Sequence, residues 1–223
     1  MEYTVKRSDR KTLALHVTDE AALVARAPAG MPPHVIEDFI RQKNDWITAH
    51  IAAKAAQAAA KSSFCLDYGS SVLFRGKECA IAPSADGRAG FDGERFFLPP
   101  GLDSDTIIRN IRHIYIQLAK ILLSEKTAKA AEKMSLSPPP VRISSAKTCW
   151  GSCGGKGISY SWRLVLADDG AINYVVVHEL AHIIHRNHGS GFWREVGAVV
   201  PDYKLQTQKL RKLQKRLEAE RWD

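Results

Sequence analysis

The sequence has few cysteines and no long apolar run, and each shortage excludes a class of protein. Four cysteines in 223 residues are too few for the disulfide framework of a small secreted scaffold, so we expect reduced thiols. No apolar stretch approaches the ~18–20 residues of a membrane-spanning helix. The first residues, Met1 to Lys6, lack the apolar core of a signal peptide. These absences predict a cytoplasmic protein without a membrane partner.

Acidic residues are also too few to balance the basic ones. There are 32 lysines and arginines against 24 aspartates and glutamates, which gives a net charge of +8 and a pI of about 9.4. This excess permits a nucleic-acid or nucleotide partner at a basic surface, but it says nothing about the fold. Much of it follows residue 203, where one helical face is formed by Gln206, Leu210, Leu213 and Leu217. A surface helix docked by its leucines is favoured there over a nucleic-acid-binding arm.

The first hundred residues read as a β-rich region interrupted by one long helix. Short β-prone segments at 3–6, 12–17 and 22–26 predict a three-stranded meander. Apolar residues from Val35 to Ile51 then recur at helical spacing, and an alanine-rich tail follows to residue 60. A second set of strands is expected within 64–98, where glycines mark the turns.

The remaining residues suggest a second, mixed region. Asp103 or Ser104 can cap a helix that continues to about Met134, and Pro138 to Pro140 end it. Strands are expected at 141–144 and 157–166, on either side of a turn-rich segment at 149–155. An apolar helix should follow over 171–184, ended by Asn187 or Gly189. We therefore predict an α+β protein with two domains, residues 1–100 and 101–223.

The most informative segment of that last helix is His178-Glu179-Leu180-Ala181-His182. Histidines four residues apart face the same side of a helix, so both imidazoles can bind one ion, and zinc suits such ligands. Glu179 is then placed to take a proton from a water molecule as a general base. A shuffled chain of this composition contains the motif with a probability on the order of one per cent. Polar side chains in an apolar helix also need partners, and a metal ion would supply one.

Two histidines compete as the third protein ligand of this ion. His185 continues the same helical stripe, but its Cα lies ~10.5 Å along the axis from that of His178, so three imidazoles would converge poorly. His188 follows Asn187, where the helix can turn and bring the ring back from another direction. Its distance in sequence from His182 is that of the last histidine in H-E-x-x-H-x-x-G-x-x-H. We favour His188, which leaves His185 solvated or behind the ligands.

Other polar residues carry weaker expectations. The segment 157–164 could form a strand at the edge of a cleft and pair with an extended peptide, and Tyr160 or Arg163 could stabilise an oxyanion there. Cys149 and Cys153 have the spacing of two metal ligands but lack two further partners, so we interpret them as loop residues.

Several segments together resemble the YgjP-like metallopeptidases, a zincin-like family related to the SprT-like and Wss1-like zinc proteases. These segments are Val5-Lys6-Arg7-Ser8, Lys11-Thr12-Leu13, Asp45-Trp46-Ile47, Trp150-Gly151-Ser152-Cys153, Trp162-Arg163-Leu164, Tyr174 to His182, His188, Phe192-Trp193 and Pro201-Asp202-Tyr203-Lys204. The resemblance implies His178, His182 and His188 as zinc ligands and Glu179 as catalytic base. Cys149 stands where the family usually has arginine, and Tyr160-Ser161 stands where Leu-Asn is common.

The expected activity is therefore that of a zinc metallopeptidase. One Zn²⁺ per chain would activate water for peptide-bond hydrolysis, in a zincin-like domain that follows the β-rich region. One alternative is a metal-dependent nucleotide phosphohydrolase, in which the ion would polarise a phosphoryl oxygen, although no P-loop motif accompanies it. Another is a DNA-associated protease or a nucleic-acid-binding module, which the basic C-terminal helix suggests.

Overall fold

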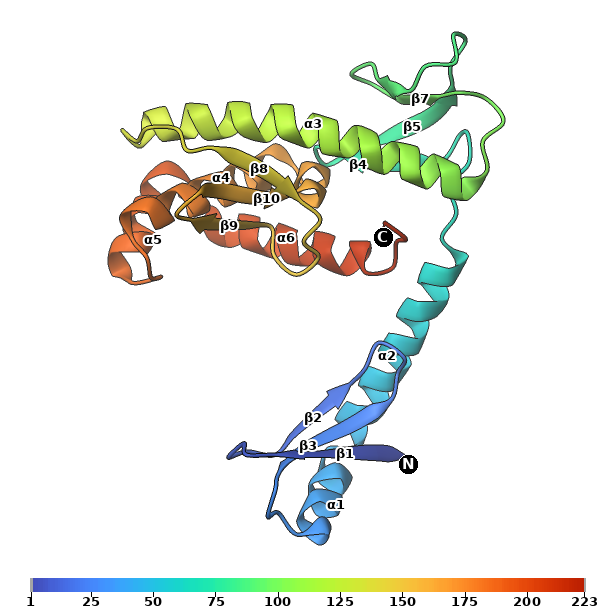
Figure 1. Ribbon diagram of the computed structural model, residues 1–223, viewed down its shortest axis with the longest axis vertical. Coiled ribbons are helices and arrows are strands. Elements are labelled where there is room, and N and C mark those ends of the chain that lie inside the picture. The colour runs from blue at the N-terminus through green and yellow to red at the C-terminus, as the bar shows by residue number, and fades with distance from the viewer. Residues whose placement is uncertain (1, 223) are drawn as a thin grey trace. The chain divides into compact units, whose positions relative to one another are not determined.

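The computed structural model describes residues 2–222 and divides them into two compact units (Figure 1). The small unit comprises the chain up to Phe64 together with Glu218–Arg221, and the large unit comprises Cys65–Leu217 and Trp222. The predicted boundary at residues 100 and 101 differs from this division. Residues 65–100 are tied to later segments, since the Arg75 N–H donates to the Val165 carbonyl and the Tyr115 hydroxyl donates to the Leu73 carbonyl.

The small unit begins with a three-stranded sheet made of β1 (Tyr3–Ser8), β2 (Ala14–Val17) and β3 (Leu23–Pro28). Its order is β1-β3-β2, with β1 parallel and β2 antiparallel to β3, so the predicted meander is wrong. The central strand of the sheet, β3, is also the most apolar of the three. Leu23, Ala25 and Ala27 of β3 are buried, whereas β1 exposes every side chain from Thr4 to Ser8.

Two helices cover this sheet where the sequence predicted one, namely α1 (Pro33–Gln42) and α2 (Asn44–Ser63). The backbone of Lys43 leaves the helical region at φ −100° and ψ 14°. Neither glycine nor proline marks this position, so the pattern of apolar residues carries no sign of the break. Ile36, Ile40 and Ile47 pack into the core of the unit, and the alanine-rich end of α2 stays largely exposed, as expected.

The large unit starts with a four-stranded sheet and a long helix. β4 (Ser71–Phe74), β5 (Lys77–Pro83), β6 (Gly90–Phe91) and β7 (Phe96–Leu98) are arranged in the order β4-β5-β7-β6. Helix α3 (Ser104–Lys133) begins where predicted, because the Asp103 carboxylate accepts a hydrogen bond from the Thr106 N–H at 2.8 Å. Its buried stripe includes Ile107, Ile111 and Tyr115.

A second sheet lies beside α3, with the order β8-β10-β9 (Figure 1). Its strands are β8 (Val141–Ser144), β9 (Gly151–Gly154) and β10 (Gly157–Ser161). We expected a loop where β9 lies, because three glycines within 151–155 hide its strand character. The predicted strand over 157–166 ends at Ser161, and Trp162–Leu166 form a fully buried 3₁₀ turn, η1. The Ser161 hydroxyl caps that turn by accepting from the Arg163 N–H.

Three further helices complete the large unit: α4 (Asp169–Ile184), α5 (Ser190–Val199) and α6 (Tyr203–Leu217). Helix α4 is the most enclosed, since nine of its sixteen residues are buried. The α6 helix docks through Gln206, Leu210 and Leu217, which confirms the predicted stripe. Overall the chain is a mixed α+β protein. Within residues 2–222 no helix is both long and apolar enough to cross a lipid bilayer.

Candidate metal centre

Three histidine side chains meet at the C-terminal end of α4. His178 and His182 lie one turn apart on one face of the helix, and their ring centroids are 5.0 Å apart. The helix ends at Ile184, the last residue of the predicted apolar segment, and the chain then turns back. This turn brings the Nε2 atom of His188 to 3.1 Å from that of His178. One nitrogen from each of the three rings lies within 4.8 Å of the others, close enough for a common ion.

His185 lies outside this group of nitrogens, and its side chain points toward α5. A Cβ atom placed on Gly191 would lie 3.0 Å from Cε1 of the His185 ring. The backbone of His185 nevertheless serves the site, because its carbonyl oxygen lies 3.0 Å from Nδ1 of His182. A carbonyl can only accept, so Nδ1 of His182 carries the proton and donates it. The Nε2 lone pair of His182 is therefore left for a metal ion.

A residue that sequence reasoning did not single out as functional orients the first histidine. The Tyr174 hydroxyl, one turn earlier on α4, lies 3.4 Å from Nδ1 of His178. The contact turns Nδ1 away from the triad and Nε2 toward it, which is the arrangement typical of ligating histidines. The signal was present in the sequence, because residues four apart share a helix face, but a tyrosine at that position is also common in a core.

The electrostatics of the group keep the first ring neutral. Burial, and to a smaller extent the nearby His182 and His188, lower the pKa of His178 to about 4. An imidazole must be unprotonated to ligate a metal ion, so His178 is in the ligating form at neutral pH.

Glu179 points to a different side of α4, against the edge strand β9. Its side chain is 6% exposed, and burial raises its pKa to about 7, although a hydrogen bond from the Cys153 backbone N–H opposes this rise. The contact with β9 is close: a Cβ atom on Gly151 would lie 2.7 Å from Cγ of Glu179. A glycine at that position leaves room for the carboxylate. A carboxyl group with a pKa near neutral pH can both accept and return a proton.

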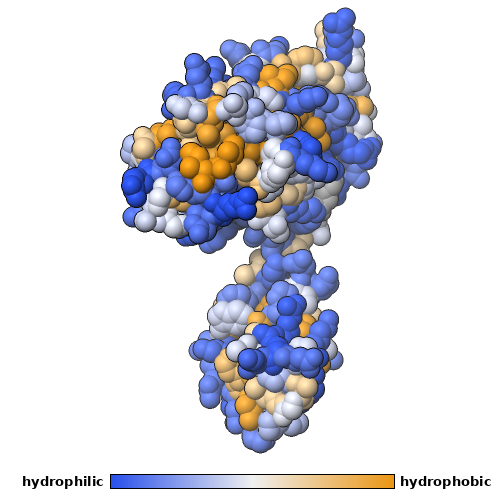
Figure 2. All heavy atoms as spheres, turned by 60° about the vertical axis from the view of Figure 1, so that its left-hand side comes forward, coloured by the Kyte–Doolittle hydropathy of each residue, from blue (hydrophilic) through white to orange (hydrophobic). Residues whose placement is uncertain are grey.

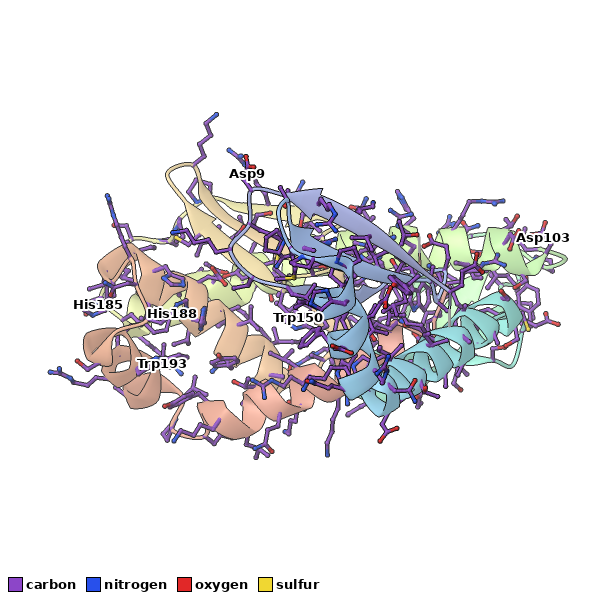
Figure 3. All side chains as sticks on the ribbon, turned by 90° about the horizontal axis from the view of Figure 1, so that it is seen from below. Asp9, Asp103, Trp150, His185, His188 and Trp193 are labelled. Carbon is purple, nitrogen blue, oxygen red and sulfur yellow. The ribbon has the colours of Figure 1, made fainter. Side chains whose placement is uncertain are left out.

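Aromatic side chains of α5 form one wall of the centre. The Phe192 ring centroid lies 4.6–4.9 Å from those of all three histidines, and Trp193 stacks on His188 at 5.8 Å. Figure 3 shows His185, His188 and Trp193 together at the end of the large unit where α4 passes into α5. These rings shield the imidazoles from solvent on one side and hold His188 in position.

The weaker expectations from sequence fare differently. Tyr160 is fully buried with its hydroxyl 3.2 Å from Oγ1 of Thr127, and Arg163 donates to the carbonyls of Ser145 and Trp222. Both side chains are engaged in the core, which favours a structural role for them over that of oxyanion donors. The strand at 157–161 is the centre of its sheet and not an edge. All four cysteines are free thiols, and Cys153 lies in β9 instead of a loop.

Comparison with known proteins identifies a family for this chain. The model of the YgjP-like family, described as a metallopeptidase domain, matches residues 11–213. The chain belongs to the YgjP-like metallopeptidase family. Among solved structures, it is similar to the metallopeptidase zymogen abylysin of Pyrococcus abyssi, with 23% identity, a TM-score of 0.39, and coverage of 44% of this chain and 98% of that chain. It is also similar to the metallopeptidase zymogen jannalysin of Methanocaldococcus jannaschii, with 19% identity and a TM-score of 0.36. That match covers 41% of this chain and 96% of the jannalysin chain. No curated protein matches the sequence.

The residues present suit the metal ion that a YgjP-like metallopeptidase requires. Imidazole nitrogens are preferred ligands of first-row transition metals, and two of the three rings have their other nitrogen held by a defined partner. The neutral state of His178 removes the main electrostatic obstacle to binding a cation. The donor set therefore fits one divalent ion.

Proposed function

We propose that the protein is a zinc-dependent, zincin-like peptidase in which His178, His182 and His188 hold the ion and Glu179 is the general base. The observation that carries this proposal is the convergence of three imidazole nitrogens, together with a buried glutamate, next in sequence to His178, whose pKa is about 7. Three histidines leave a tetrahedral zinc site one open position for water or substrate. When bound, the zinc ion would supply Lewis acidity to the attacking water and to the scissile carbonyl.

The chain's own residues would then move the proton. Glu179 accepts it from the attacking water, which needs the carboxylate form, and passes it to the leaving amine, which needs the acid form. A pKa near 7 makes both forms accessible at neutral pH. Burial against Gly151 keeps bulk water from competing for the carboxylate.

A polypeptide substrate suits the surroundings of the site. Strand β9 is a sheet edge and contacts Glu179, so an extended peptide that pairs with β9 would pass the proposed base. Ile183 and Ile184, directly after His182, are 44% and 45% exposed. The large unit also presents a contiguous apolar area on the side that carries α5 (Figure 2). Apolar surface of this kind favours peptide side chains over a highly charged nucleotide.

The two alternatives considered from sequence receive no such support. The family match is to a metallopeptidase domain. Part of the basic charge of α6 is used inside the large unit, since Lys209 pairs with Asp168 at 3.1 Å and Arg216 pairs with Glu78 at 2.7 Å. These pairs reduce the charge that α6 offers to a polyanion.

The experiment compares Glu179→Gln with the wild-type chain. Gln keeps the size of the side chain but cannot accept the proton, so we expect near-normal zinc content and peptide hydrolysis reduced by about 10²–10⁴-fold. Glu132→Gln, at an exposed site on α3, serves as the matched control and should retain activity. Cleavage is followed on a peptide library, with nucleotide hydrolysis measured in parallel. Near-wild-type cleavage by Glu179→Gln, or loss of its zinc, would contradict the assignment.

A further inference from the structure

One cavity of the large unit is lined by none of the histidines. It measures about 310 Å³ and is lined by the hairpin that joins β9 to β10, residues 152–159, together with Arg142 of β8. The polar groups of its wall are two cationic side chains, Arg142 and Lys156, and two hydroxyls, Ser152 and Ser159. No carboxylate belongs to this wall.

The strand register explains why these groups converge. Ser159 of the central strand β10 is paired with Arg142 on β8 and with Ser152 on β9. Paired residues of neighbouring strands project from the same side of a sheet, so the three side chains form one row across it. The adjacent register position, Cys153, lies on the opposite side, toward Glu179. The row and the cavity are therefore on the face of the sheet that points away from the metal centre.

The positive charges of this cavity are not balanced by the protein. In the part of the chain that the structure describes, neither Arg142 nor Lys156 lies within ion-pair distance of a carboxylate. Some other cationic side chains of the large unit do have such partners: Lys126 pairs with Asp169 at 3.3 Å and Lys209 with Asp168 at 3.1 Å. Two unbalanced cations in one cavity repel each other, and an anion placed between them would remove that repulsion.

The hairpin backbone adds further donors. Residues 154–157 read Gly-Gly-Lys-Gly, and a Cβ atom on Gly154 or Gly155 would meet nothing, so a ligand can approach the main chain. Gly157 adopts φ +113° and packs so closely on Pro140 that no side chain fits there. The turn is therefore fixed by glycine, and its main chain is open to a ligand at Gly154 and Gly155.

We propose that this cavity binds a phosphate-type oxyanion. An arginine fork and a lysine point charge neutralise a dianion, and two hydroxyls and turn amides satisfy its remaining oxygens. A single carboxylate would leave one cation and several donors unused. The anion can be free phosphate or a phosphoryl group on a polypeptide, since both present the same tetrahedral oxygens. The proposal does not rest on peptidase activity and stands or falls separately from it.

The test titrates the full chain, with a chelator present to exclude metal, with inorganic phosphate at constant ionic strength. Binding is followed by calorimetry and by the amide resonances of Gly154, Gly155 and Gly157 in ¹H–¹⁵N spectra. We expect saturable binding with shifts centred on these glycines, and no such shifts with chloride. A phosphoserine peptide and its unphosphorylated form make a second arm. Tighter binding of the phosphopeptide than of free phosphate identifies a polypeptide source, and equal or weaker binding identifies the free anion.

The variant Arg142→Ala/Lys156→Ala should weaken phosphate binding at least about tenfold. Arg211→Ala/Lys212→Ala removes the same charge from an exposed part of α6 and should leave binding unchanged. Equal unfolding midpoints of the two variants show that the hairpin variant is folded. If the hairpin variant does not fold, Ser152→Ala/Ser159→Ala tests the site instead, because it keeps both charges. Non-saturable binding, equal loss in both charge variants, or shifts confined to the histidines would overturn the proposal.

Discussion

Glu179 should make the stability of the metal-free protein depend on pH in a way that its replacement by Gln abolishes. In the fold its pKa is about 7, against an ordinary value of 4.5, because the side chain is buried. Between these two pH values the folded chain binds more protons at Glu179 than the unfolded chain does. Folding stability is therefore lost as pH rises through this window, and the loss is complete above pH 7. The gap between the two pKa values corresponds to about 3 kcal/mol at full effect.

The assay is urea unfolding of wild type and Glu179→Gln between pH 4 and pH 8, with a chelator present. Fluorescence of the buried Trp162 and Trp222 reports on the large unit. His178 acts in the opposite sense: its pKa of about 4 makes stability rise with pH up to about 6.5, but it does so in both proteins and cancels in the comparison. Between pH 4 and pH 8 the free energy of unfolding of Glu179→Gln should rise by about 3 kcal/mol relative to that of the wild type. A difference that stays constant with pH would refute a buried, neutralised Glu179.

Three further outcomes are expected. Tyr174→Phe removes the hydroxyl beside the first histidine of the triad, so chelator competition should show metal affinity lowered by about 10–100-fold, and an unchanged affinity would deny Tyr174 any orienting role. Gly151→Ala places a Cβ atom 2.7 Å from Cγ of Glu179, so peptide cleavage should fall about a hundredfold with metal content retained in elemental analysis. His188→Ala should lose metal occupancy while His185→Ala retains it, and the reverse result would exchange their roles.

The sequence by itself determined the local features of this structure. Helix periodicity and an N-terminal aspartate placed α3 within a residue or two of its observed limits, because capping and amphipathic spacing depend on neighbours in the chain. The same reasoning put His178 and His182 on one face of a buried helix. Local reasoning did not predict the β1-β3-β2 order, because strand order depends on which strand is most apolar once all three are packed.

The tertiary structure decided the rest of the site. Spacing favoured His188 over His185 but could not place its ring, and the turn after Ile184 brings the Nε2 atom of His188 to 3.1 Å from that of His178. Strand β9 was hidden by its glycines, yet it is the strand that packs on Glu179 and helps to bury it. Burial raises the pKa of that carboxyl to about 7, and no residue adjacent in sequence could have indicated it. Side-chain spacing follows from local backbone geometry, whereas convergence and burial arise only when segments distant in sequence pack together.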